Sequence, residues 1–186
     1  MIVIDGPAEL CGELKVQGAK NSTLPLLAAT VLCRGQTVLH NCPHLSDVDT
    51  AVRILEHLGS RCRWQGDSLV VDTSMTCFQI PPELMREMRS SIVFLGAIIS
   101  RCGEAELCFP GGCELGPRPI DLHIDALRRL GVEIEESGGC LRCCAPEGIQ
   151  GTYISLSFPS VGATENIILA AACSRGTTVI ANAARE

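Results

Sequence analysis

The residues best suited to chemistry lie in the stretch from Cys108 to Ile124, which reads CFPGGCELGPRPIDLHI. Two adjacent glycines precede Cys113, and a Gly-Pro pair precedes Arg118. Glycine adopts backbone angles closed to other residues, and proline disfavours helix in the residue before it, so we predict a surface loop with Cys113 near its tip. Pro119 and Asp121 suit the first turn of the helix that follows. A thiol and a guanidinium on a glycine-hinged loop suit a lid over an anionic ligand.

A second candidate is Lys20, one of two lysines among the fifteen Lys and Arg residues. Asn21 or Ser22 is the expected cap of a helix over residues 21–33. Lys20 would then stand at a helix N-terminus, where free N–H groups and a partial positive charge favour anions. The alternative is an ordinary solvated lysine in front of a helix.

The elements that must position these residues form an internal repeat of βαβαββ-like units. The first copy has a helix over 21–33, a strand over 36–40, a helix over 47–58 and strands over 61–64 and 68–71. The second has a helix over 82–101, a strand over 104–109, a helix over 119–130 and strands over 133–135 and 141–144. A third opens with a helix over 163–173 and a strand over 177–181. With two short strands expected over 2–16, the fold class is α/β (α+β).

The third copy stops before its second helix, at Glu186. An apolar face would lack its cover, which a stable domain does not tolerate well. We therefore expect the sequence to be a fragment of a longer protein.

In the first copy, Ser46 or Asp47 is the expected cap of the second helix, and Gly59 is the expected C′ residue after it.

Composition excludes several classes of function. A net charge of −6 argues against nucleic acid or an anionic membrane as the main partner, and with one tryptophan and one tyrosine the chain also lacks the residues for base stacking. The N-terminus has no basic region of a signal peptide, and the apolar runs are too short for a membrane span. We expect a soluble, cytoplasmic protein.

Twelve cysteines are present, yet the length and strong hydrophobic periodicity argue against a disulfide scaffold. Most are expected to act as small hydrophobes, such as Cys33 in a helix and Cys108 in a strand. Cys140, Cys143 and Cys144 form a CxxCC cluster, which is a weak zinc signal because no second cluster accompanies it. No metal or organic cofactor is expected.

Six motifs, in order along the whole chain, resemble the UDP-N-acetylglucosamine 1-carboxyvinyltransferase family: Gly18-Ala19-Lys20-Asn21, Asp47-Val48-Asp49-Thr50, Arg89-Ser90-Ser91, Pro110-Gly111-Gly112-Cys113, Arg118-Pro119-Ile120-Asp121-Leu122-His123 and Ser160-Val161-Gly162-Ala163-Thr164-Glu165-Asn166. Each motif alone is weak, but together they are specific. That family is similar in fold to 5-enolpyruvylshikimate-3-phosphate synthase, with two domains of three repeated units each. The resemblance implies that residues 18–186 are an incomplete first domain, and that residues 1–17 are strands of a second domain otherwise absent here.

The resemblance implies transfer of the enolpyruvyl group of phosphoenolpyruvate to the 3-hydroxyl of UDP-N-acetylglucosamine, with release of phosphate. This is the first committed step of bacterial peptidoglycan synthesis, and it implies roles in cell wall biogenesis, cell shape, cell cycle and cell division. Cys113 would be the general acid that protonates the enol methylene carbon, and the target of fosfomycin. Lys20 and Asn21 would meet phosphoenolpyruvate, and Arg89 and Arg118 would contact anionic groups. The residues implied for the nucleotide-sugar site are Arg118, Pro119, Ile120, Asp121, Leu122, Ser160, Val161 and Gly162.

The family also uses an Asp base and an Arg from its other domain, so these 186 residues alone are expected to be inactive. Alternatives are a stand-alone nucleotide-sugar binding or regulatory module, a transferase acting on shikimate 3-phosphate, and a thiol redox or zinc protein. The sequence PGGCELGPRP argues against the shikimate enzyme. His123 stays open between helix packing and site support. Asp47 and Asp49 are expected as caps, and Glu165 as a partner of a helix dipole in the first turn.

Overall fold

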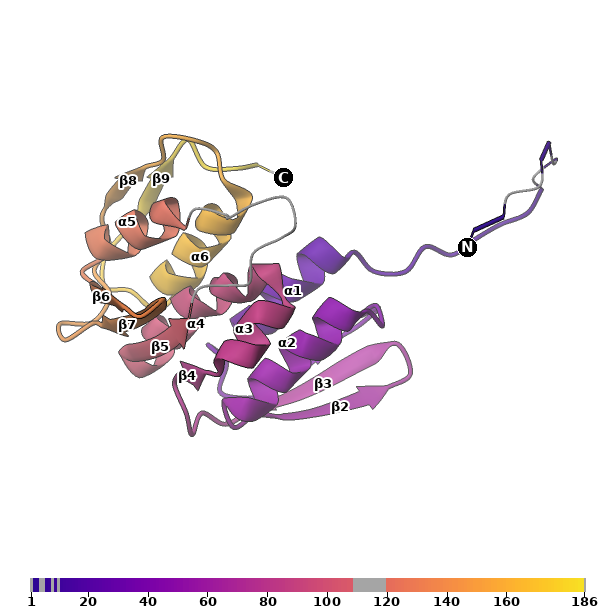
Figure 1. Ribbon diagram of the computed structural model, residues 1–186, viewed down its shortest axis with the longest axis horizontal. Helices are drawn as coiled ribbons and strands as arrows, with labels where there is room; N and C mark the ends of the chain where they lie inside the picture. The colour runs from indigo at the N-terminus through magenta and orange to yellow at the C-terminus, as the bar shows by residue number, and fades with distance from the viewer. Residues whose placement is uncertain (1, 4–5, 8, 10, 109–119, 186) are drawn as a thin grey trace.

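The computed structural model describes residues 2–3, 6–7, 9, 11–108 and 120–185. Three helices, one from each copy of the repeat, pack against one another in the centre of the molecule: α1 (Lys20–Thr30), α4 (Phe94–Cys102) and α6 (Val161–Ala171). Their contacts bury Leu27, Phe94 and Ile167 completely. In Figure 1 these helices lie between β2 and β3 at the lower edge of the view and β8 and β9 at the upper edge.

Within the described residues, the strands form three separate sheets. β1 (Gly35–Leu39), β2 (Arg61–Gln65) and β3 (Ser68–Thr73) are antiparallel, in the order β1-β3-β2. The second sheet has the order β4-β5-β7-β6, from β4 (Gln79–Ile80), β5 (Glu104–Cys108), β6 (Glu133–Ser137) and β7 (Cys140–Cys144). β4 is parallel to β5, and the other pairs are antiparallel. β8 (Tyr153–Ser155) and β9 (Val179–Ala181) form a parallel pair. The α+β class and the repeated units are confirmed.

The second helix of the first copy and that of the second copy each pack on one of the three central helices α1, α4 and α6, called the inner helices below. α2 (Ser46–His57) lies on α1, and α5 (Asp121–Arg129) lies on α6. Each of these two helices buries one apolar face. Leu58 after α2 and Leu130 after α5 belong to these faces, and both are completely buried. Gly59 follows α2 with φ of 109°, a left-handed conformation that glycine adopts at little cost. Its predicted C′ position is therefore confirmed.

The helix predicted over residues 82–101 is broken into three parts: α3 (Pro82–Glu87), a 3-10 segment η1 (Arg89–Val93), and α4. Met88 between them is extended, with φ of −128° and ψ of 120°. The Ser91 hydroxyl donates to the Met85 carbonyl at 3.1 Å, so a side chain satisfies a backbone acceptor at the break. Met88 is fully buried, and tertiary packing outweighs the local helical pattern here.

The predicted N-caps are wrong. α1 begins at Lys20 with Ala19 as its N-cap, so Asn21 and Ser22 already lie inside the helix. α2 begins at Ser46 after Leu45, and neither helix has a side-chain cap. Asp47 and Asp49 lie in the first turn of α2 instead. Carboxylates there still stabilise the helix, because they face its partial positive charge.

The two short strands predicted over residues 2–16 are not found in the described part of that segment. These residues are mostly exposed and extend away from the helices (Figure 1). A strand forms only where a neighbouring strand can pair with it, and the described residues place none beside this segment. The assignment of residues 1–17 to a second domain stays a prediction.

Two predictions about cysteines are wrong. Cys108 and Cys140 face each other across β5 and β7 and form a disulfide, because the antiparallel register places them directly opposite. Cys33 lies after the end of α1 and is exposed. Cys143 does act as a hydrophobe: it is buried, and burial raises the pKa of its thiol to about 12. Within the described residues, no group of three or more His, Cys, Asp or Glu side chains is placed to hold a metal ion.

Apolar side chains remain uncovered on two of the inner helices. Leu26 of α1 is 55% exposed and Ile168 of α6 is 54% exposed. Leu26 borders an apolar groove of about 410 Å³ between α1 and β1.

Of the helices in the described ranges, none has the length and apolar character needed to cross a bilayer.

Candidate functional site

One cavity of about 730 Å³ lies where the N-terminal ends of five helical segments, α1, α2, η1, α5 and α6, come together. Each segment contributes residues from its first turn or its cap. The cavity is lined by Lys20, Asn21, Leu24, Pro25, Asp47, Glu87, Arg89, Ser90, Ile92, Val93, Ile120, His123, Ser160, Val161, Gly162 and Glu165. The repeat explains the convergence, because equivalent helices of successive copies begin at the same side of the molecule.

The electrostatics of this cavity favour an anionic ligand. Helix N-termini present N–H groups without intrahelical partners and carry a partial positive charge. The α6 end is partly satisfied, because the Ser160 hydroxyl accepts from the Ala163 N–H at 3.3 Å. Lys20 and Arg89 add two positively charged side chains to the cavity lining, where both residues are exposed.

Lys20 is held in place by a carboxylate of the neighbouring helix. Its Nζ lies 2.8 Å from Oδ2 of Asp47, with the two side chains 46% and 29% exposed. The first residue of α1 and the first turn of α2 are thus joined across the cavity. An ion pair this exposed adds little to stability, but it holds the ammonium group beside Asp47 in the lining of the cavity.

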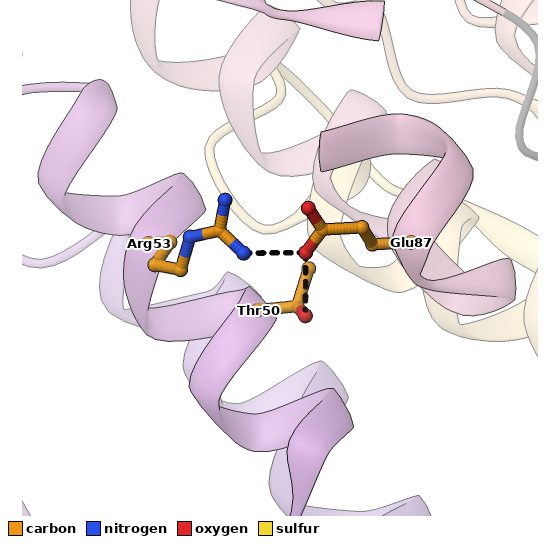
Figure 2. A network of polar contacts seen from close by, with 3 residues as sticks. All are labelled: Thr50, Arg53 and Glu87. Atoms are coloured by element: carbon orange, nitrogen blue, oxygen red, sulfur yellow. Dashed lines mark hydrogen bonds and ion pairs between the residues drawn. The ribbon is translucent and has the colours of Figure 1, made fainter. Parts of the chain in front are cut away.

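Three acidic side chains, Asp47, Glu87 and Glu165, also line the cavity, and the first two are paired with cations. Glu87 at the end of α3 accepts hydrogen bonds from Arg53 and from the Thr50 hydroxyl, both on α2, as Figure 2 shows. The guanidinium of Arg53 offsets the negative charge of Glu87. Burial raises the pKa of the Glu165 carboxyl. Glu165 lies beyond the first turn of α6, so the role predicted for it there is wrong.

Most of the residues that the sequence assigned to the site, and that the structure describes, line this one cavity. They come from four separate stretches of sequence: Lys20, Asn21, Arg89, Ile120, Ser160, Val161 and Gly162. Asp121 and Leu122 do not line it: Asp121 is exposed at the start of α5, and Leu122 packs against the core. Cys113, Arg118 and Pro119 lie outside the described residues.

His123 is both a packing residue and part of the cavity wall. It is 8% exposed, and burial lowers the pKa of its imidazole to about 4. Its Nδ1 lies 2.9 Å from Nδ2 of Asn166, which is completely buried in α6. Sequence reasoning missed the role of Asn166. The signal was a single amide among the apolar residues of α6, where an unsatisfied polar group would be costly.

Stability should therefore depend on pH through His123. The unfolded imidazole binds a proton near pH 6.5 and the folded one only near 4, so the folded state loses stability as pH falls through this window, by roughly 3 kcal/mol. Urea unfolding of the wild type and of His123→Asn at pH 7 and pH 4.5 measures this. We expect the wild type to lose more stability than the variant on acidification; equal losses would contradict the assignment.

Comparisons with known proteins agree with the fold and the motifs. The family model for EPSP synthase (3-phosphoshikimate 1-carboxyvinyltransferase) matches residues 4–186. UDP-N-acetylglucosamine 1-carboxyvinyltransferase 2 of Caldanaerobacter subterraneus subsp. tengcongensis is 54% identical over 184 residues, 98% of this chain and 44% of that protein. The UDP-N-acetylglucosamine 1-carboxyvinyltransferase of Saccharophagus degradans is 43% identical over 187 residues, 100% of this chain and 44% of that protein. The chain thus spans less than half the length of these relatives.

Solved structures show the same fold at lower sequence identity. The enolpyruvyl transferase NikO from Streptomyces tendae superposes with a TM-score of 0.77 at 22% identity, over 92% of this chain and 40% of that one. EPSP synthase from Acinetobacter baumannii gives a TM-score of 0.70 at 16% identity, over 91% and 40%. The resemblance read from the sequence motifs is confirmed, and the chain belongs to the EPSP synthase (3-phosphoshikimate 1-carboxyvinyltransferase) family.

Proposed function

We propose that this chain supplies the part of an active site that binds phosphoenolpyruvate and UDP-N-acetylglucosamine, and that the whole protein transfers the enolpyruvyl group to the 3-hydroxyl of the sugar with release of phosphate. The observation that carries this proposal is the convergence of five helical N-termini, with Lys20 and Arg89, on one cavity. Both substrates are polyanions, and this arrangement suits them. The relatives at 54% and 43% identity support the choice of acceptor sugar.

Lys20 and Asn21 are assigned to phosphoenolpyruvate. The ammonium group of Lys20 and the free N–H groups at the start of α1 can share the phosphate and carboxylate oxygens. Asp47 then has the role of a positioning residue, because its carboxylate holds Lys20 at 2.8 Å before the ligand binds. Arg89, and Arg118 by sequence, are assigned to further anionic groups.

The nucleotide sugar is assigned to the other side of the cavity, at the start of α5 and α6. Ile120, Ser160, Val161 and Gly162 line it there. A side chain at Gly162 would place its Cβ 3.3 Å from Cε1 of His123, so glycine keeps this wall open. Asp121 and Leu122 are assigned to the same ligand by sequence motif alone.

Cys113 is assigned as the general acid. Its thiol proton goes to the methylene carbon of phosphoenolpyruvate while the sugar 3-hydroxyl oxygen bonds to the adjacent carbon and gives up its proton to a base. In the second half of the reaction the bond from that carbon to the phosphate oxygen breaks, phosphate leaves, and the new methyl group returns a proton to the Cys113 thiolate, which restores the double bond and the general acid. An alkylating epoxide such as fosfomycin would meet the same thiol.

The remaining parts of the proposal follow the resemblance. Residues 18–186 form an incomplete first domain and residues 1–17 belong to a second, which would supply an Asp base and an Arg. The chain alone is then inactive, and it works with that second domain in the bacterial cytoplasm. The product serves peptidoglycan synthesis, and with it cell wall biogenesis, cell shape, the cell cycle and cell division. Steady phosphate release by these 186 residues, dependent on both substrates, would contradict this assignment.

The choice of substrate is tested by calorimetric titration of this chain with UDP-N-acetylglucosamine and, separately, with shikimate 3-phosphate. We expect binding of the nucleotide sugar, and binding of shikimate 3-phosphate at least about 10-fold weaker, because differences of a few hydrogen bonds separate two ligands by that factor. Tighter binding of shikimate 3-phosphate would support the other transferase. Binding of neither ligand would contradict the proposal.

A further inference from the structure

Asn166 joins three segments of the chain from a position at 0% exposure. Its Oδ1 accepts a hydrogen bond from the Gly96 N–H in α4 at 2.5 Å. Its Nδ2 donates to the Ile92 carbonyl in η1 at 3.0 Å and lies 2.9 Å from Nδ1 of His123 in α5. Both hydrogens of Nδ2, and the oxygen of this amide, therefore have partners.

The backbone partners fix which way the amide points. The Gly96 N–H can only donate and the Ile92 carbonyl can only accept, so Oδ1 must face Gly96 and Nδ2 must face Ile92. The second hydrogen of Nδ2 is then directed at His123. A flipped amide would set donor against donor and acceptor against acceptor, at a fully buried position where such a mismatch is costly.

The orientation of Asn166 in turn fixes the tautomer of His123. Since Nδ1 receives a hydrogen from Asn166, it must present its lone pair, and the ring hydrogen of a neutral imidazole resides on Nε2. In the described part of the chain no hydrogen-bond partner is recorded for Nε2, and His123 lines the cavity close to Gly162. Burial keeps the ring neutral near pH 7, since its pKa is lowered to about 4.

We propose that Asn166 is a positioning residue: by holding Nδ1 of His123, it presents the Nε2–H of an uncharged ring to an acceptor oxygen of the bound nucleotide sugar. The identity of that ligand rests on the proposed function, whereas the tautomer does not. The charged groups that line the same cavity are Lys20, Asp47, Glu87, Arg89 and Glu165. The Nε2–H of His123 is an uncharged donor among these charged side chains. It can favour a ligand with an acceptor oxygen at this position without strengthening the general electrostatic attraction of the cavity for anions.

The tautomer is measured by nitrogen-15 NMR of the His123 ring in this chain without ligand. We expect a pyridine-type Nδ1 and a pyrrole-type Nε2 at pH 7. Asn166→Asp keeps the side-chain shape but sets a carboxylate oxygen against Nδ1, so the hydrogen should move to Nδ1 and the imidazole pKa should rise. A wild-type ring with its hydrogen on Nδ1, or one that averages both tautomers, would overturn the proposal.

Two matched variants separate positioning from packing. His123→Asn keeps an oxygen that accepts from Asn166 but loses the donor at Nε2, whereas His123→Gln can restore an N–H near the Nε2 position. We expect UDP-N-acetylglucosamine to bind about 10-fold more weakly to His123→Asn, with partial recovery in His123→Gln. Unchanged affinity of His123→Asn for UDP-N-acetylglucosamine would overturn the proposal. This test does not depend on the folding of Asn166→Asp.

The two proposals fail in different ways. A wild-type chain that binds no UDP-N-acetylglucosamine while its His123 ring shows the predicted tautomer would refute the proposed function and leave the Asn166–His123 arrangement standing. Binding of the nucleotide sugar with the opposite tautomer would refute this inference alone.

Discussion

Gly96→Ala is expected to destabilise the chain by more than about 3 kcal/mol, beyond the usual cost of overpacking a core. A Cβ at Gly96 would collide with the Asn166 carbonyl oxygen and with its Oδ1, far inside van der Waals contact. The first of these atoms belongs to the backbone of α6 and cannot rotate away, so α4 and α6 would have to separate. Separation would also break the hydrogen bond from the Gly96 N–H to Asn166.

Urea unfolding followed by circular dichroism measures this effect, with Ser100→Ala as the matched control. Ser100 lies one turn later in α4, and its buried hydroxyl has no hydrogen-bond partner among the described residues. Alanine there removes an unsatisfied group and is a better helix former, so the control should match the wild type or exceed its stability. A Gly96→Ala midpoint equal to that of the wild type would show that α4 and α6 do not approach this closely.

Lys20→Ala is expected to weaken binding of phosphoenolpyruvate by about 10- to 100-fold, the range for one charge-assisted contact. Lys20 is the first residue of α1 and lines the cavity, where its Nζ lies 2.8 Å from Oδ2 of Asp47. Without it, the carboxylate of Asp47 would stand uncompensated beside the ligand. Attraction would then be replaced by repulsion at one side of the site.

The second lysine of the chain provides the control. Lys15 lies in the exposed extended segment before α1 and does not line the cavity. Lys15→Ala changes net charge by the same amount, so a titration of both variants with phosphoenolpyruvate separates a local contact from a general electrostatic effect. Equal losses of affinity in the two variants would contradict a role for Lys20 at the site.

Local patterns were sufficient to predict the helices and most strands, because their apolar periodicity is strong. These patterns failed where contacts between distant parts of the chain determine the local structure. Met88 breaks a continuous helical pattern since its buried position and the Ser91 hydroxyl favour an extended residue. β4 and β8, of two and three residues, were not predicted, because strands this short carry little periodicity; β9, also of three residues, was predicted only as part of the longer stretch 177–181. The Cys108–Cys140 disulfide depends on strand register, which no local pattern contains.

Motifs named several of the residues that line the cavity, but they did not give its geometry. The sequence shows Lys20, Arg89 and Gly162 in separate motifs, and only the packing of the three inner helices places them around one cavity. Asn166 was hidden for the same reason: its partners lie 70, 74 and 43 residues away along the chain. A polar residue in an apolar helix indicates that partners exist but does not identify them.

The cavity at the five helical N-termini is proposed to bind the nucleotide sugar. Backbone amide NMR of this chain during titration with UDP-N-acetylglucosamine tests this proposal most directly. We predict that the signals of Ser160, Val161 and Gly162 shift in a saturable manner, while those of β2 and β3, at the lower edge of Figure 1 and outside the cavity lining, stay in place. Saturable shifts confined to residues outside the cavity, or no shifts at all, would contradict the account.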